Sequence, residues 1–144
     1  MSSTASDILK DLADALRATG EFALVTIGAD GSETAVPRAN VLHESTEEYP
    51  PDDNSNERWV RQRARVVVHT RSQDPAAAIT RANDLCAAAA AALTNDPNRG
   101  GLCQALPIGR ATEVGRCDVT TGIRRPEVEM SFGVRNHYVA EDGA

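Results

Sequence analysis

An arginine-rich strand followed by a long alanine-rich helix constrains the fold of this chain most strongly. From Arg61 to Arg71 the sequence RQRARVVVHTR alternates small or apolar residues with mostly basic ones. A period of two is typical of a strand that is buried on one face and exposed on the other. Asp74 suits an N-cap, and Pro75 suits the first helical turn, where the N–H that proline lacks has no partner. The pattern therefore predicts a strand, a sharp turn and a helix over 75–93.

One stripe of this predicted helix is apolar but shallow. Spacings of three and four residues place on it Ile79, Ala82, Cys86, Ala89 and Leu93. Because most of these side chains are small, we expect the helix to lie close against a sheet, with Ile79 and Leu93 as its main anchors. Cys86 is expected to be a buried, inert thiol.

The segments before the arginine-rich strand predict another helix and a hairpin. Residues 4–19 form an amphipathic pattern, and Thr4 with an aspartate three residues on resembles a weak capping box. A short β-rich run at 22–27, an Asp-Gly turn signal and a second run at 34–42 predict two antiparallel strands. Pro37 in the second run indicates an edge strand or a bulge, because proline cannot donate a hydrogen bond to a neighbouring strand.

The last third of the chain predicts two further strands. A weaker pattern over 109–120 is followed by an expected loop at 122–126 and by the clearest alternation, from Glu127 to Tyr138. The polar face of that last strand offers carboxylates where the arginine-rich strand offers guanidinium groups. If the two strands pair, Glu–Arg contacts across them would help to set their register.

Together these patterns predict a single α/β (α+β) domain over residues 1–144. Residues 141–144 are expected to form a frayed tail.

The net charge of −6 is concentrated in residues 43–57, which contain six acidic residues, two prolines and no lysine or arginine. Such a segment buries too little apolar surface to offset its ordering entropy, so we expect a mobile acidic loop. This local acidity argues against a general nucleic-acid-binding surface, which would be basic. No apolar run is long enough to cross a bilayer, and no signal peptide is evident, so a soluble intracellular product is expected.

The sequence offers no motif for catalysis or cofactor binding. It lacks a dinucleotide-binding glycine pattern, a phosphate-binding loop and a nucleophile elbow. His69 and His137 fall on predicted strands beside arginines, where positive charge disfavours a protonated base and repels a metal cation. Neither these two nor His43 has a second ligand at metal-binding spacing, and the three cysteines are odd in number and far apart. We therefore expect no catalytic, cofactor-binding or metal-binding residues.

The order of motifs along the chain is more informative about function than the composition is. A helix SDILKDLADALRAT opens the chain, the strand RQRARVVVHTR passes through SQDP into the alanine-rich helix, and an exit LTNDPNRGGL precedes the strand EVEMSFGVRNHYV. In this order the chain resembles the tail terminator (tail-completion) proteins of tailed viruses and related prophages. The resemblance covers most of the chain, from Ser6 to Val139.

The resemblance implies an α/β (α+β) fold with a mixed or antiparallel sheet of about four to five strands, flanked by two main helices, and a role in assembly. Such proteins form a six-membered ring on the tail tube, end tube polymerisation, and provide the surface that joins the tail to the head connector. The implied partners are further copies of the chain, the tail-tube protein and head–tail connector proteins, with genome DNA passing through the ring without specific binding. The implied location is the tail or neck of the virion, after assembly in the host cytoplasm. No catalytic residues carry over from the family.

A ring subunit needs complementary charged surfaces, and this chain offers acidic and basic candidates. The expected subunit-interface residues are Glu44, Glu47, Glu48, Asp52, Asp53, Arg61, Arg63 and Arg65. Two alternatives stay open at this point: another neck or head–tail connector component, and a small cytoplasmic ligand-binding protein or enzyme.

Overall fold

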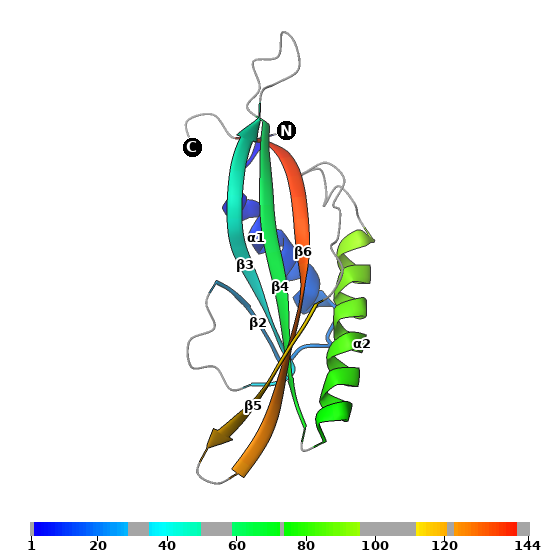
Figure 1. The fold of residues 1–144 in the computed structure, drawn as a ribbon. Helices are drawn as coiled ribbons and strands as arrows, with labels where there is room; N and C mark the ends of the chain where they lie inside the picture. Colours follow the sequence, from blue (N-terminus) through cyan, green and yellow to red (C-terminus); the bar gives the residue numbers. More distant parts are fainter. Residues whose placement is uncertain are drawn as a thin grey trace.

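The computed structural model describes residues 2–28, 35–49, 59–72, 74–95, 112–120 and 123–140. In chain order the elements are β1 (Ser2–Ser3), α1 (Ala5–Ala18), β2 (Leu24–Ile27), β3 (Arg38–Tyr49), β4 (Trp59–Arg71), α2 (Pro75–Thr94), β5 (Thr112–Thr120) and β6 (Ile123–Ala140). Figure 1 shows β3, β4 and β6 as long neighbouring strands, with α2 alongside them.

The six strands form one mixed sheet in the order β1-β6-β4-β3-β2, and β5 also pairs with β6. The pairs β3–β4, β4–β6 and β5–β6 are antiparallel, whereas β1–β6 and β2–β3 are parallel. The expected α/β class with a mixed sheet and two main helices is confirmed. The described part of the sheet exceeds the expected four to five strands, because the two-residue β1 adds to the end of β6.

Both helices begin where the sequence predicts. Thr4 is the N-cap of α1: its hydroxyl accepts from the backbone N–H of Asp7, and the Asp7 carboxylate accepts from the Thr4 N–H, each at 3.1 Å. Gly20 follows the helix with a φ of 71°, a left-handed conformation that favours glycine. Asp74 caps α2 by accepting from the Ala76 N–H at 3.1 Å, and Pro75 occupies the first turn.

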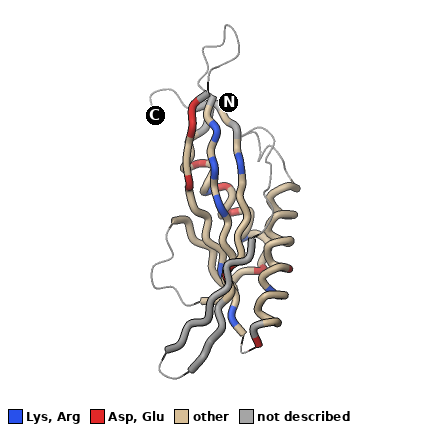
Figure 2. Tube along the Cα trace, in the orientation of Figure 1, with Lys and Arg blue, Asp and Glu red and all other residues tan. Residues whose placement is uncertain are grey.

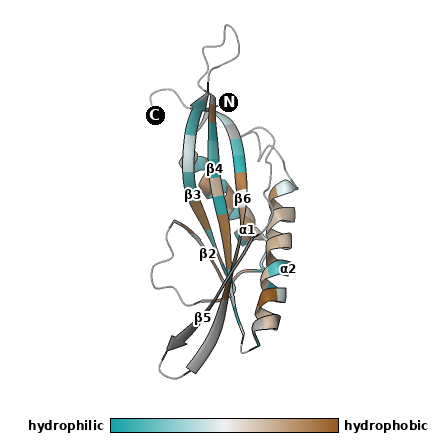
Figure 3. Cartoon of the chain, viewed as in Figure 1, coloured by the Kyte–Doolittle hydropathy of each residue, from teal (hydrophilic) through white to brown (hydrophobic). Residues whose placement is uncertain are grey.

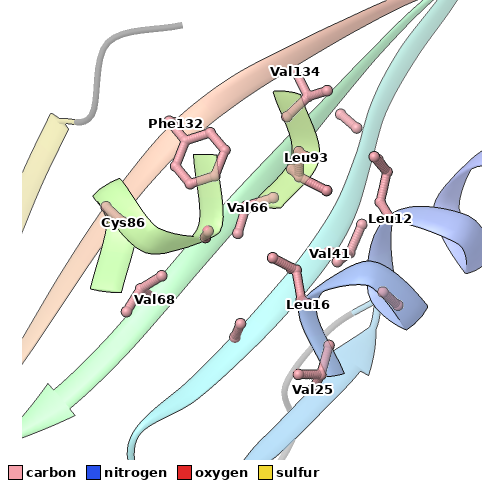
Figure 4. Close-up of a cluster of buried hydrophobic side chains, with 14 of the residues drawn as sticks. Leu12, Leu16, Val25, Val41, Val66, Val68, Cys86, Leu93, Phe132 and Val134 are labelled. Atoms are coloured by element: carbon pink, nitrogen blue, oxygen red, sulfur yellow. The ribbon is translucent and has the colours of Figure 1, made fainter. Parts of the chain in front are cut away.

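The core lies between one face of the sheet and the two helices. The α1 helix packs on β2 and β3, the α2 helix packs on β4 and β6, and the helices touch each other. Alternate residues of β4, including Val66 and Val68, point into this core with Phe132 of β6 (Figure 4). Alanines and Cys86 on α2 keep that helix close to the strands, as the shallow stripe predicts.

The anchor expected at Ile79 is wrong. Ile79 is only partly buried, whereas Leu85 is 1% exposed and Leu93 is fully buried. The rest of the predicted stripe is buried, and the buried face takes in Ala78 and Leu85 in place of Ile79; the four confirmed residues are Ala82, Cys86, Ala89 and Leu93. The many alanines of α2 made the two stripes nearly equal in hydrophobicity, so packing against the sheet decided between them.

The predicted hairpin of the first two strands is also wrong. Strands β2 and β3 pair in parallel, with Leu24 opposite Arg38 and Ile27 opposite Val41. An Asp-Gly turn signal specifies only a local reversal of the chain. Whether the two strands then pair in parallel or antiparallel depends on the position that each strand takes in the sheet. Pro37 precedes β3, so its missing N–H lies outside that strand.

Two expected loops are partly strands. Residues 43–49, the first part of the expected acidic loop, form the end of β3, because their backbone pairs with β4. The rest of that loop, the tail at 141–144 and the glycine exit after α2 lie outside the described residues. The expected loop at 122–126 falls largely within β6, where Pro126 lies opposite Cys117 of β5. The β4–β6 pairing starts only at Glu127, so Pro126 needs no donor on that side.

Candidate subunit interface

The sheet face opposite the helices, here called the open face, carries the charged residues of β4. In this strand Val60, Gln62 and Ala64 point into the core, and the intervening arginines at 61, 63 and 65 point to the open face. Figure 2 shows these basic residues on β4, acidic residues on the neighbouring β3 and a further basic position on β6. In the same part of the three strands, Figure 3 shows mostly hydrophilic colouring.

Arg65 is held by residues of the same chain. Its Nε pairs with Glu44 Oε1 on β3, and its Nη1 donates to Ser131 Oγ on β6 at 2.8 Å. Side chains from three adjacent strands therefore meet on the open face. The expected candidates Glu44 and Arg65 do come together, but within one subunit, so this pair helps to fix the β3–β4–β6 register.

Arg63 lies directly opposite Arg135 in the β4–β6 pairing. Both side chains are exposed, and neither forms an ion pair or a hydrogen bond with any described residue. Like charges directly opposite each other on adjacent strands are destabilising. The sequence analysis did not find Arg135 as a candidate, because only the register of β6 brings it beside Arg63. The expected Glu–Arg pairing is largely wrong: the register places Glu127 opposite Arg71, but the arginines at 61, 63 and 65 lie opposite His137, Arg135 and Gly133.

The other acidic candidates separate between the two faces of β3. Glu47 lies opposite Arg61, on the open face, whereas Glu48 lies opposite the core residue Val60. A register shift between His43 and Ser45 places an extra residue in β3 and reverses the alternation. Both glutamates are exposed. The candidates Asp52 and Asp53 lie outside the described residues.

A chain of polar groups crosses the sheet further along. Thr26 Oγ1 donates to Asn40 Oδ1 at 2.7 Å, and Asn40 Nδ2 lies 3.4 Å from His69 Nε2. His69 Nδ1 is 3.5 Å from a carboxylate oxygen of Glu129.

His69 lies opposite Arg38 in the β3–β4 register, beside an arginine as expected, and it also contacts an amide and a carboxylate. Asn40 and His69 are almost completely buried, at 3% and 4% exposure. Their satisfied hydrogen bonds explain how these polar residues tolerate burial and link β2, β3, β4 and β6. The sequence showed only a histidine after three valines, a weak signal for such a network.

A second polar cluster lies at the core side of the sheet. Gln62 and Asn136 are fully buried, and Asn136 Nδ2 donates to Gln62 Oε1 at 3.5 Å. Gln62 Nε2 in turn lies 3.4 Å from the Ala5 carbonyl oxygen and 3.1 Å from His43 Nδ1. The cluster therefore connects β4 and β6 to the first turn of α1 and to β3.

The remaining candidates for chemistry are the thiol of Cys86 and possible groups of metal ligands. Burial raises the pKa of the Cys86 thiol from 9.0 to about 11, so it stays protonated at neutral pH. Among the described residues, no group of three or more His, Cys, Asp or Glu is placed to hold a metal ion. Neither α1 nor α2 is long and apolar enough to cross a membrane.

Comparison of the sequence with protein-family models and with curated proteins finds no match.

Proposed function

We propose that this protein is a non-catalytic subunit of a six-membered ring that caps the tail tube of a tailed virus or prophage. The observation that carries the proposal is the open face of the sheet, where acidic residues of β3 lie towards one side and the exposed Arg135 of β6 towards the other, with the exposed Arg63 of β4 between them. A closed ring is built from head-to-tail contacts, so each subunit must present two different and complementary surfaces. This distribution of charge supplies such a pair of surfaces.

In the proposed role the protein acts by binding alone. A ring seated on the last turn of the tail tube blocks the surface to which the next tube subunit would add. Its opposite side then offers the head connector a docking surface at the neck of the virion, with DNA passing through the centre. The acidic β3 and the basic β4 and β6 serve subunit contacts in this scheme.

The decisive experiment adds the purified protein to polymerising tail-tube protein encoded by the same genome. We expect rings at one end of each tube by negative-stain electron microscopy, and tubes that stop growing once a ring is bound. Tubes polymerised without the protein are the control and should continue to lengthen. Unchanged elongation, or binding along the sides of the tubes, would refute the proposal. Binding to an isolated head connector but never to tubes would favour another neck component.

A further inference from the structure

Gly133 leaves one position of β6 without a side chain on the open face. Glycine in the interior of a strand costs stability, and it often marks a place where a ligand approaches the backbone closely. The described glycines with a positive φ are Gly20 and Gly28, so the backbone conformation does not require glycine at 133. A Cβ added there would meet no described atom within 4 Å, so packing within the subunit does not require it either.

Arginines surround this position on the same face. Arg65 lies directly opposite Gly133, and the next pair along the two strands is Arg63 opposite Arg135. Arg63 and Arg135 are exposed, and neither forms an ion pair or a hydrogen bond with any described residue. Adjacent strands lie about 4.8 Å apart, so both guanidinium groups can reach one small group placed between them. The pair therefore offers converging donors without a described acceptor.

The charge around Gly133 defines the kind of ligand that fits. Glu44 pairs with Arg65, so the three arginines and this one carboxylate leave a formal charge of +2. Two like charges directly opposite each other on adjacent strands are destabilising, and a ligand with two negative charges removes that repulsion. A phosphate monoester carries about −1.5 to −2 at pH 7, and arginine binds phosphate oxygens with two parallel hydrogen bonds.

We propose that Arg63 and Arg135 bind a dianionic phosphate group, which lies over Gly133 on the open face. Arg65, held by its contacts to β3 and β6, adds positive charge at a fixed position beside the group. The ligand is inorganic phosphate or a small phosphorylated molecule. A nucleic acid is disfavoured, because it needs several phosphate contacts along a basic surface, and the acidic end of β3 lies one strand away from Arg63. This binding goes beyond the proposed ring and does not depend on it.

Titration calorimetry of the full chain tests the site. Inorganic phosphate and adenosine monophosphate are titrated separately at about pH 7.5 and constant ionic strength, so that screening does not change while the phosphate is dianionic. The protein is kept at a concentration at which sedimentation velocity shows a monomer. We expect saturable binding with one site per chain. Comparable binding of the two ligands would identify the phosphate group itself as the recognised part, and binding of inorganic phosphate alone would limit the site to the free ion.

Substitutions of the two arginines assign the binding to this face. Arg63→Gln and Arg135→Gln should each weaken phosphate binding at least about tenfold, which corresponds to 1.4 kcal/mol. Without phosphate, both variants should melt at the same temperature as the wild type or higher, because each removes the repulsion between the pair. Arg81→Gln, on the exposed side of α2, is the matched control and should bind like the wild type.

Gly133→Val tests the position under the ligand. Valine favours a strand, so the variant should melt no lower than the wild type, whereas its side chain should block the approach of phosphate and weaken binding. The proposal is overturned if the wild type shows no saturable binding of either ligand, or if both arginine variants bind as tightly as the wild type. It is also overturned if a gel-shift assay shows duplex DNA binding that depends on Arg135 while neither small ligand binds.

Discussion

Replacing Leu85 by alanine should destabilise the protein more than any other single truncation on α2 except that of Leu93. Leu85 is 1% exposed, and the change removes three buried carbon atoms, each worth about 0.8 kcal/mol of transfer free energy. That gives about 2.4 kcal/mol before any cavity is counted. The buried residues about one turn before and after Leu85 on the helix are Ala82 and Ala89, whose short side chains cannot move to fill the space. We therefore expect a total cost of about 3–4 kcal/mol.

The expected loss is large enough to measure in several ways. A domain of this size has an unfolding entropy of about 0.3 kcal/mol per kelvin, so the melting temperature should fall by about 10 °C. Urea unfolding followed by circular dichroism should show a lower midpoint with an unchanged slope. Ile79→Ala is the control on the same helix, and its partial burial predicts a cost of only about 1–2 kcal/mol. An Ile79→Ala cost equal to or above that of Leu85→Ala would refute this reading of the buried stripe.

Three further predictions concern the core. Gln62→Leu should lower the free energy of unfolding, because it removes a buried amide whose contacts join Asn136, the Ala5 carbonyl oxygen and His43; urea titration of this variant and the wild type tests it. Ala89→Leu should lower the melting temperature by overpacking the helix–sheet contact, and a rise would contradict the close approach of α2. Cys86 favours folding fully below pH 9.0, its unfolded pKa. This contribution should be lost as the pH rises towards about 11, because the unfolded thiol ionises first, so the unfolding free energy of the wild type should fall relative to Cys86→Ala over this range.

The candidate interface was only partly predictable. The arginines at 61, 63 and 65 were found from the alternation of β4 alone, and their position on one exposed face follows from a period of two. Arg135 was not, because only the β4–β6 register places it beside Arg63. The Glu44–Arg65 pair similarly depends on the extra residue in β3, which no local sequence pattern predicts.

The polar chain through Asn40 and His69 also combines features that the local sequence predicts with contacts that only the tertiary structure decides. Each residue belongs to a strand that was foreseen at least in part, but its partner lies on another strand. Sequence spacing cannot show which polar side chains meet across a sheet, since one residue of slip moves every side chain to the other face.

The sequence by itself determined the features whose causes are local. The capping box of Thr4 and Asp7, the Asp74–Pro75 start of α2 and the alternation of β4 each depend on interactions within a few residues, so they were foreseen and are present. Tertiary structure alone decided that β2 runs parallel to β3, that Leu85 rather than Ile79 faces the core, and that Arg63 meets Arg135. These outcomes are set by how distant segments share one sheet and one core, where the free energy of packing outweighs weak local preferences.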